Sequence, residues 1–163
     1  RITTGSDAFL PRVPAFRGRL VLALGVPGAR RVYRRERDGV TLTPLTTQGD
    51  NDNPTVSASG RVTAWDADGD LLGSGDPGRQ VHEPALDARG QDLAVQSAED
   101  LAGTGNAGAL QVFARALDGV LRQVSRGAGA SRNPAYDKRG RTLVFHSTSD
   151  PLVGWFPDAT FRP

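Results

Sequence analysis

Three stretches of the sequence share one outline: a Pro, a polar turn that ends in Gly six positions later, and a short apolar run. They are NPTVSASGRVTAW (53–65), EPALDARGQDLAV (83–95) and NPAYDKRGRTLVF (133–145), and RLVLAL (19–24) after Gly18 is an earlier relative of the apolar run. A recurring outline of this length indicates that one small structural unit is stacked several times. The repeat therefore constrains the architecture of the chain far more than it constrains the ligand.

Each unit predicts a β-hairpin. The turns SASG, DARG and DKRG combine short polar side chains, which bond to nearby backbone, with a Gly that tolerates positive φ. The runs that follow are short, apolar and bounded by turn residues, which is typical of strands covered on both faces. We expect these residues to be buried in strands: Leu20, Leu22, Leu93, Val95, Leu143 and Phe145.

Two units continue with a second hairpin. RVYRRERDGVTLTPLT (31–46) aligns with QVFARALDGVLRQVS (111–125), and both carry Asp-Gly between alternating runs, at Asp38-Gly39 and Asp118-Gly119. This dipeptide is a strong hairpin signal, so a full unit has four strands. Residues 66–83 are mostly Asp, Gly and Pro, and the second unit is expected to have lost most of this outer hairpin.

The order of these motifs resembles the TolB-like, WD-like β-propeller repeat of bacterial envelope and secreted proteins. The resemblance covers roughly residues 14–152 and is clearest over 84–150. It implies an all-β, β-propeller-like fold in a single partial domain over 1–163, with about four blade units at 14–47, 54–80, 84–126 and 134–163. Propellers close with four to eight blades. Since one unit is shortened and the last stops at Pro163, we expect part of a larger ring.

Open blade edges carry apolar residues that normally pack on a neighbouring blade. The chain begins at Arg1 rather than Met, and we expect a mature form or a fragment of a longer protein. The isolated chain is predicted either to self-associate through its open edges or to cover one edge with residues 151–163.

Composition excludes several classes of function. No stretch approaches the roughly 20 apolar residues that cross a bilayer, and the absence of Cys removes disulfides and thiolate sites. Residues 1–40 hold nine Arg against three acidic residues, but the remaining residues are net acidic. The basic stretch RRVYRRERDG (30–39) falls on the third strand of a unit, so a solvated outer strand is favoured over a nucleic-acid site.

Catalysis within these residues is not expected. The chain has no G-x-S-x-G elbow, and His82 and His146 each lack a second His or Cys at ligand spacing. We predict no enzyme activity, no resident cofactor and no metal site. The alternative is that the chain is the propeller of a larger, prolyl oligopeptidase-like hydrolase whose catalytic domain lies elsewhere.

Acidic residues gather around DADGDLLGSGD (66–76). Asp66, Asp68 and Asp70 resemble the start of a calcium loop, but only the Asp70 position recurs in the other units and Pro77 replaces the expected Glu. Calcium is thus a weak candidate. In a four-stranded unit, the loop entering the first strand and the loop leaving the second lie on one rim. We predict a partner-binding rim there, made by Asp50, Asp52, Asn53, Asp66, Asp68, Asp70, Asp76, His82, Glu83 and Asn133.

These observations predict a non-catalytic binding or scaffold module that holds a protein, a peptide or an envelope polymer on one rim. A rim rich in carboxylates favours a cation or a basic partner. The TolB resemblance further implies an extracytoplasmic location, either periplasmic or secreted.

Overall fold

The chain is an all-β structure. The computed structural model describes residues 8–12, 20–67, 70–71, 81–105, 108–115, 119–137 and 139–149, with the backbone alone described for 8–12 and 70–71. These residues contain no helix, and they form four antiparallel sheets. None of them could provide a helix that crosses a membrane.

The four sheets follow one another along the chain. The first contains β1 (Ala8–Arg12), β2 (Leu20–Leu24), β3 (Arg31–Arg35) and β4 (Leu42–Pro44). The second contains β5 (Asn51–Val56), β6 (Thr63–Ala67) and the short β7 (Asp70–Leu71). The third contains β8 (His82–Leu86), β9 (Leu93–Ser97), β10 (Gln111–Arg115) and β11 (Leu121–Gln123), and the fourth pairs β12 (Ser131–Tyr136) with β13 (Leu143–Ser147).

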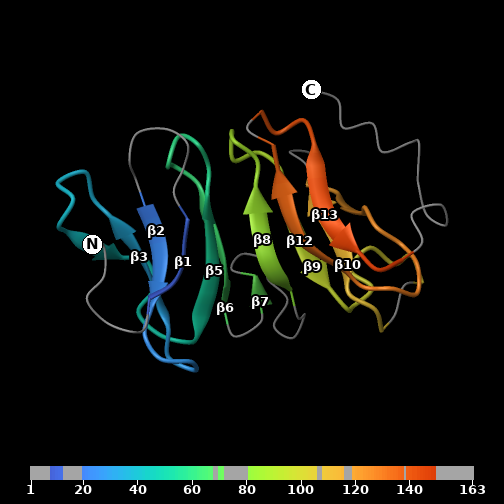
Figure 1. Cartoon of the computed structure of the whole chain (residues 1–163), viewed down its shortest axis with the longest axis horizontal. Coiled ribbons are helices and arrows are strands. Elements are labelled where there is room, and N and C mark those ends of the chain that lie inside the picture. The colour runs from blue at the N-terminus through green and yellow to red at the C-terminus, as the bar shows by residue number, and fades with distance from the viewer. Residues whose placement is uncertain are drawn as a thin grey trace.

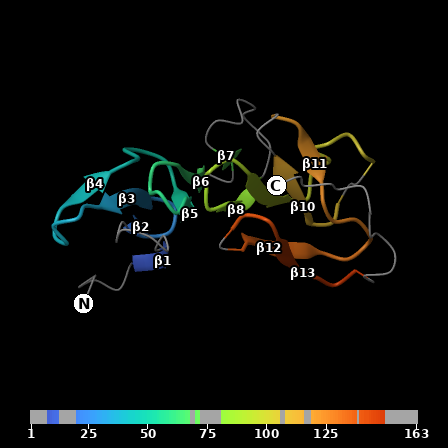
Figure 2. The ribbon, with the colours of Figure 1, turned by 90° about the horizontal axis from the view of Figure 1, so that it is seen from above.

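Consecutive sheets pack face to face. In Figure 1 the blue first sheet, the green second sheet and the third sheet follow one another from left to right, and the orange fourth sheet overlaps the third; Figure 2 shows from above that the fourth sheet lies beside the third. The first strand of each sheet contacts the sheet before it: β5 packs against β1, β2 and β3, β8 against β5 and β6, and β12 against β8, β9 and β10. The second and third sheets are therefore layers between their two neighbours in the sequence.

The predicted hairpins are present. In the outer hairpin of the first sheet, Glu36 N–H donates to Thr41 O and Gly39 has a φ of 73°. In the third sheet β10 pairs with β11 in register, and Gly119 has a φ of 77°. The second sheet has only the two-residue β7 after β6 among the described residues. These findings agree with the repeat pattern.

The three repeat turns have one geometry and stack on each other. Gly60, Gly90 and Gly140 all have φ values near 70°. Ala58 N–H donates to Ala88 O, which joins the turn of the second sheet to that of the third. A Cβ on Gly90 would lie 2.7 Å from Val62 Cγ2, so the close contact between turns as well as the positive φ requires glycine here.

The apolar core lies between the sheets. Val21 and Val32 of the first sheet pack against Trp65 of the second, and Ala85, Ala94 and Ala114 of the third pack against residues of the fourth. The six predicted core residues all lie in strands. Leu20, Leu22 and Val95 are buried as predicted. Leu93, Leu143 and Phe145 are partly exposed, so they are less buried than these three.

Candidate functional site

The first strand of each of the last three sheets contains a β-bulge directly before its repeat Pro. Register shifts occur between Asp52 and Thr55, between His82 and Ala85, and between Arg132 and Ala135. At each bulge the residue before Pro has a positive φ, of 44° at Asn53, 51° at Glu83 and 54° at Asn133. Pro cannot donate to the ladder, which explains the break in pairing. Three of the predicted rim residues therefore occupy equivalent places in successive sheets.

Arg30 holds two of the predicted acidic residues. Its Nη2 and Nε donate to the two carboxylate oxygens of Asp50 at 2.7 and 2.8 Å, a bidentate pair, and its Nη1 donates to Asp52 Oδ2. The hydrogen bond from Arg30 holds the pKa of Asp50 well below its usual range, although partial burial opposes the shift. The same bond raises the pKa of Arg30. This ion pair joins the first sheet to the second at the rim.

Asp66 forms the second half of the cluster. Its Oδ2 accepts a hydrogen bond from Asn53 Nδ2 at 2.9 Å and lies 3.8 Å from His82 Nδ1. Only 6% of its side chain is exposed, and its Oδ1 is buried without a hydrogen-bond partner. Burial raises the pKa of Asp66, because the charged form is poorly solvated there, and the hydrogen bond from Asn53 only partly offsets this.

The structure brings five of the ten predicted rim residues into one chain of contacts around Arg30. They are Asp50, Asp52, Asn53, Asp66 and His82. We define these five residues together with Arg30 as the rim cluster. Glu83 follows His82 in β8. His82 itself begins that strand.

The other predicted rim residues lie apart or are not described. Asn133 belongs to the fourth sheet, where its backbone N–H donates to Gln96 Oε1 at 2.9 Å. Asp70, in β7, pairs with Ala67 of β6. Asp68 and Asp76 lie outside the described residues. Within the part of the chain that is described, no three His, Cys, Asp or Glu side chains form a group that could hold a metal ion. Of the calcium candidates Asp66, Asp68 and Asp70, only Asp66 has a described side chain.

Arg30 is the residue of the cluster that the sequence prediction missed, because the stretch 30–39 was interpreted as a solvated strand. Arg30 comes directly before β3, in the connection that leaves β2. The rule used to place the acidic residues, that the loop leaving a second strand lies on the rim, would have placed Arg30 there too. With Arg30 included, three carboxylates face one guanidinium, and the cluster keeps an excess of negative charge.

Comparison with known proteins identifies the fold. No protein-family model matches the chain, and no curated protein matches it. A solved structure from Agrobacterium tumefaciens, described provisionally as TolB, matches it with a TM-score of 0.55 and 17% sequence identity. The match covers 90% of this chain and 56% of that one, so this chain spans little more than half the length of the solved structure.

At this level of identity the likeness establishes the fold and not the activity. The chain has a TolB-like β-propeller fold. The predicted fold class is confirmed.

Proposed function

We propose that this chain is a non-catalytic binding module of a β-propeller and that its rim cluster engages a basic segment of a protein or peptide partner. The observation that supports this most is Asp66, a buried carboxylate whose Oδ1 has no hydrogen-bond partner. A buried acceptor left unpaired costs free energy, typically about 1–3 kcal/mol and more for a charged group. A partner cation that approached Asp66 would recover that cost.

The repeat offers a comparison within the chain. At the position of Asp66 in the third sheet stands Gln96, whose side-chain oxygen accepts the N–H of the bulge residue in the next sheet. That neutral amide therefore has a structural role. Asp66 has a carboxyl group at this position instead, and one of its oxygens has no hydrogen-bond partner. A buried polar group that the fold leaves unpaired is a feature expected at functional sites.

The partner is proposed to be basic because the rim cluster has more carboxylates than guanidinium groups. Such a rim favours positively charged partners, and the attraction weakens as salt screens it. An envelope polymer with cationic groups would satisfy the same chemistry. The extracytoplasmic location suggested by the TolB resemblance belongs to this proposal.

The test measures binding of a fluorescent decapeptide of alternating arginine and serine by anisotropy, at low and high salt. Asp66→Asn is expected to weaken binding by about tenfold and to reduce its salt dependence. Asp137→Asn is the matched control, because Asp137 caps a turn at the opposite end of the strands and Asn keeps its acceptor oxygen. Equal binding of a glutamate–serine peptide, or equal losses in both variants, would refute the proposal.

The alternative, in which the chain is the propeller of a larger hydrolase, predicts the same fold. The full reading frame distinguishes the two. An adjoining hydrolase domain favours the enzyme, whereas further blade units followed by a stop codon favour the binding module.

A further inference from the structure

A recess lies between the first and second sheets, on the opposite face of β6 from the rim cluster. Trp65 and Asp66 are neighbours on β6, and Trp65 packs toward Val21 and Val32 of the first sheet whereas Asp66 faces His82 of the third. The recess has a volume of about 550 Å³ and is partly open to solvent. We define it as the Trp65 recess; its lining includes Leu45, Thr47, Gln48, Asn51, Trp65 and Ala67.

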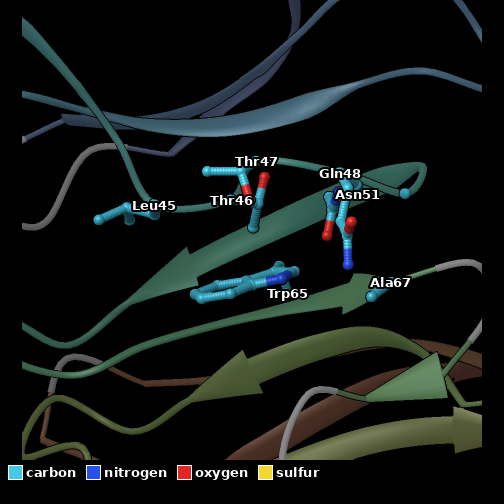
Figure 3. Close-up of a pocket in the computed structure, with 8 residues that line it drawn as sticks. Leu45, Thr46, Thr47, Gln48, Asn51, Trp65 and Ala67 are labelled. Atoms are coloured by element: carbon cyan, nitrogen blue, oxygen red, sulfur yellow. The ribbon is translucent and has the colours of Figure 1, made fainter.

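Figure 3 shows how these residues lie. Leu45, Thr46 and Thr47, from the connection between β4 and β5, stand on one side, and the indole of Trp65 lies on the other. The indole nitrogen is at the end of the ring nearer Gln48 and Asn51 (Figure 3). The recess therefore has an apolar floor with amide and hydroxyl groups beside it.

The indole N–H is the unusual feature of this recess. Trp65 is only 8% exposed, and its Nε1 is buried without an acceptor. Buried Trp side chains normally have a hydrogen-bond partner for this group, and an unmet donor costs about 1–3 kcal/mol. Gln48, an exposed residue, stands at that end of the ring.

The lining favours a neutral ligand with hydroxyl groups. Among the described residues, none of the lining side chains carries a charge, although Arg31 Nη1 donates to the backbone oxygen of Gly49 at its edge, and this argues against an anion or a cation. The exposed side chains of Thr47 and Gln48 both donate and accept hydrogen bonds, as hydroxyl groups do, whereas Asn51 Nδ2 already donates to Arg30 O and Gln48 O. The volume lies in the range of small-molecule sites.

An extended peptide fits less well, because the backbone here is already paired within the protein. The N–H groups of Leu45 and Thr46 both donate to Val32 O, and the N–H of Asn51 donates to Arg30 O. A peptide that adds to a sheet needs free backbone groups of this kind.

We propose that the Trp65 recess binds a saccharide unit, with a ring oxygen or hydroxyl oxygen accepting the Trp65 Nε1–H and the amide of Gln48 bonding a second hydroxyl. The apolar face of the sugar lies against Trp65, Leu45 and Ala67. The recess adjoins the rim cluster through Asn51, whose backbone N–H and Nδ2 both donate to Arg30 O, but the proposal does not depend on the proposed rim function.

The test follows the indole N–H signal of Trp65 by NMR in the full chain carrying Trp155→Phe, which leaves Trp65 as the single Trp. The probes are maltose, cellobiose and N,N′-diacetylchitobiose, with a neutral peptide of alternating alanine and threonine for comparison. We expect one of the saccharides to give a saturable shift of the indole signal and to slow its exchange with solvent.

Two exposed glutamines provide matched variants. Gln48→Ala is expected to weaken the binding about tenfold, as for the loss of one hydrogen bond. Gln91→Ala, at an exposed position in the turn after β8, is expected to leave it unchanged. Absence of a shift with all three saccharides, a shift with the peptide instead, or equal binding by wild type and Gln48→Ala would overturn the proposal.

Discussion

The third and fourth sheets each have a face directed toward the later part of the chain, and the same repeat positions lie on both faces. Among the described residues, this face is covered by another sheet only in the third. Ala85 pairs with Ala94 in the third sheet as Ala135 pairs with Val144 in the fourth. Ala94 is fully buried against the fourth sheet, whereas 57% of Val144 is exposed. In this fold, a repeat position belongs to the core or to the surface according to whether another sheet packs on it.

The polar members of these faces follow the same rule. Gln96 is buried and its side-chain oxygen accepts the Asn133 N–H, which ties the third sheet to the fourth. His146 occupies the equivalent position in the fourth sheet and is exposed. A further blade unit packed on the fourth sheet would bring a bulge N–H to His146, as the fourth brings one to Gln96.

The largest expected effect is on stability, when a Val on the covered face of the third sheet and a Val on the exposed face of the fourth are each replaced by Ala. Val112 is fully buried in β10, paired with Gln96, and Val112→Ala should lower the free energy of unfolding by about 2–3 kcal/mol through lost burial and a cavity. Val144→Ala should lower it by less than about 0.5 kcal/mol. Urea unfolding of the two variants checks the comparison, and equal losses would mean that the fourth sheet is covered after all.

The next effect comes from exchanging residues between the two faces. Ala94→Val gives the third sheet the residue that the fourth has, at a site with no exposed surface. Overpacking there should cost about 1–3 kcal/mol. Thermal unfolding is the measurement. If Ala94→Val is neutral, the contact between the third and fourth sheets is looser than the burial of Ala94 indicates.

Glycines distinguish the cost of a close contact from the cost of backbone conformation. Gly90 and Gly103 both have positive φ, but a Cβ would meet Val62 and Ser57 only at Gly90, and nothing within 4 Å at Gly103. Gly103→Ala should cost about 1 kcal/mol for its conformation alone. Gly90→Ala should cost roughly 1–2 kcal/mol more, since the turn of the second sheet blocks the methyl group. If Gly90→Ala and Gly103→Ala lower the denaturant midpoint by the same amount, the turns do not stack tightly in solution.

Much of this arrangement could be predicted from the sequence because the repeat is local. The turn glycines and the apolar runs after them determine the hairpins, and the Asp38-Gly39 dipeptide predicts the outer one. The pairing of Arg30 with Asp50 could not be read from the repeat, because it joins two different sheets. The partial exposure of Leu143 and Phe145 has a related cause: burial depends on the neighbouring sheet as well as on the strand.

A smaller effect on stability is expected from pH, through Asp66. This residue occupies the position in the second sheet that Gln96 occupies in the third. Burial raises the pKa of Asp66, so between its ordinary value of about 3.9 and its raised value the folded protein binds the proton more readily than the unfolded chain. The contribution of Asp66 to stability therefore falls as pH rises through that interval. Asp66→Asn should remove this pH-dependent contribution.

Asp50 provides the control of opposite sign for that experiment. Its pKa is lowered by Arg30, so its contribution to stability is present above the ordinary aspartate pKa and is lost as pH falls through the lowered value. Urea unfolding between pH 3 and pH 7 should show Asp66→Asn and Asp50→Asn changing the slope in opposite directions. A common direction would contradict the assignment of Asp66 as the desolvated carboxylate.

The weakest expected effect is association through the uncovered face of the fourth sheet. On the described part of that face, Ala135 and Val144 form the only apolar pair, and the polar pair Arg132 and His146 lies beside them. Because this apolar surface is small, self-association should be weak and visible only at high protein concentration. Val144→Glu places a charge in this face and should keep the chain monomeric, while Val40→Glu, on an 84% exposed residue of the first sheet, should not. Light scattering over a concentration series measures this, with thermal unfolding to check that both variants fold. If the wild-type chain stays monomeric at every concentration, the face of the fourth sheet is not an interface between copies; the predicted alternative, an edge covered by residues 151–163, concerns residues outside the described ranges.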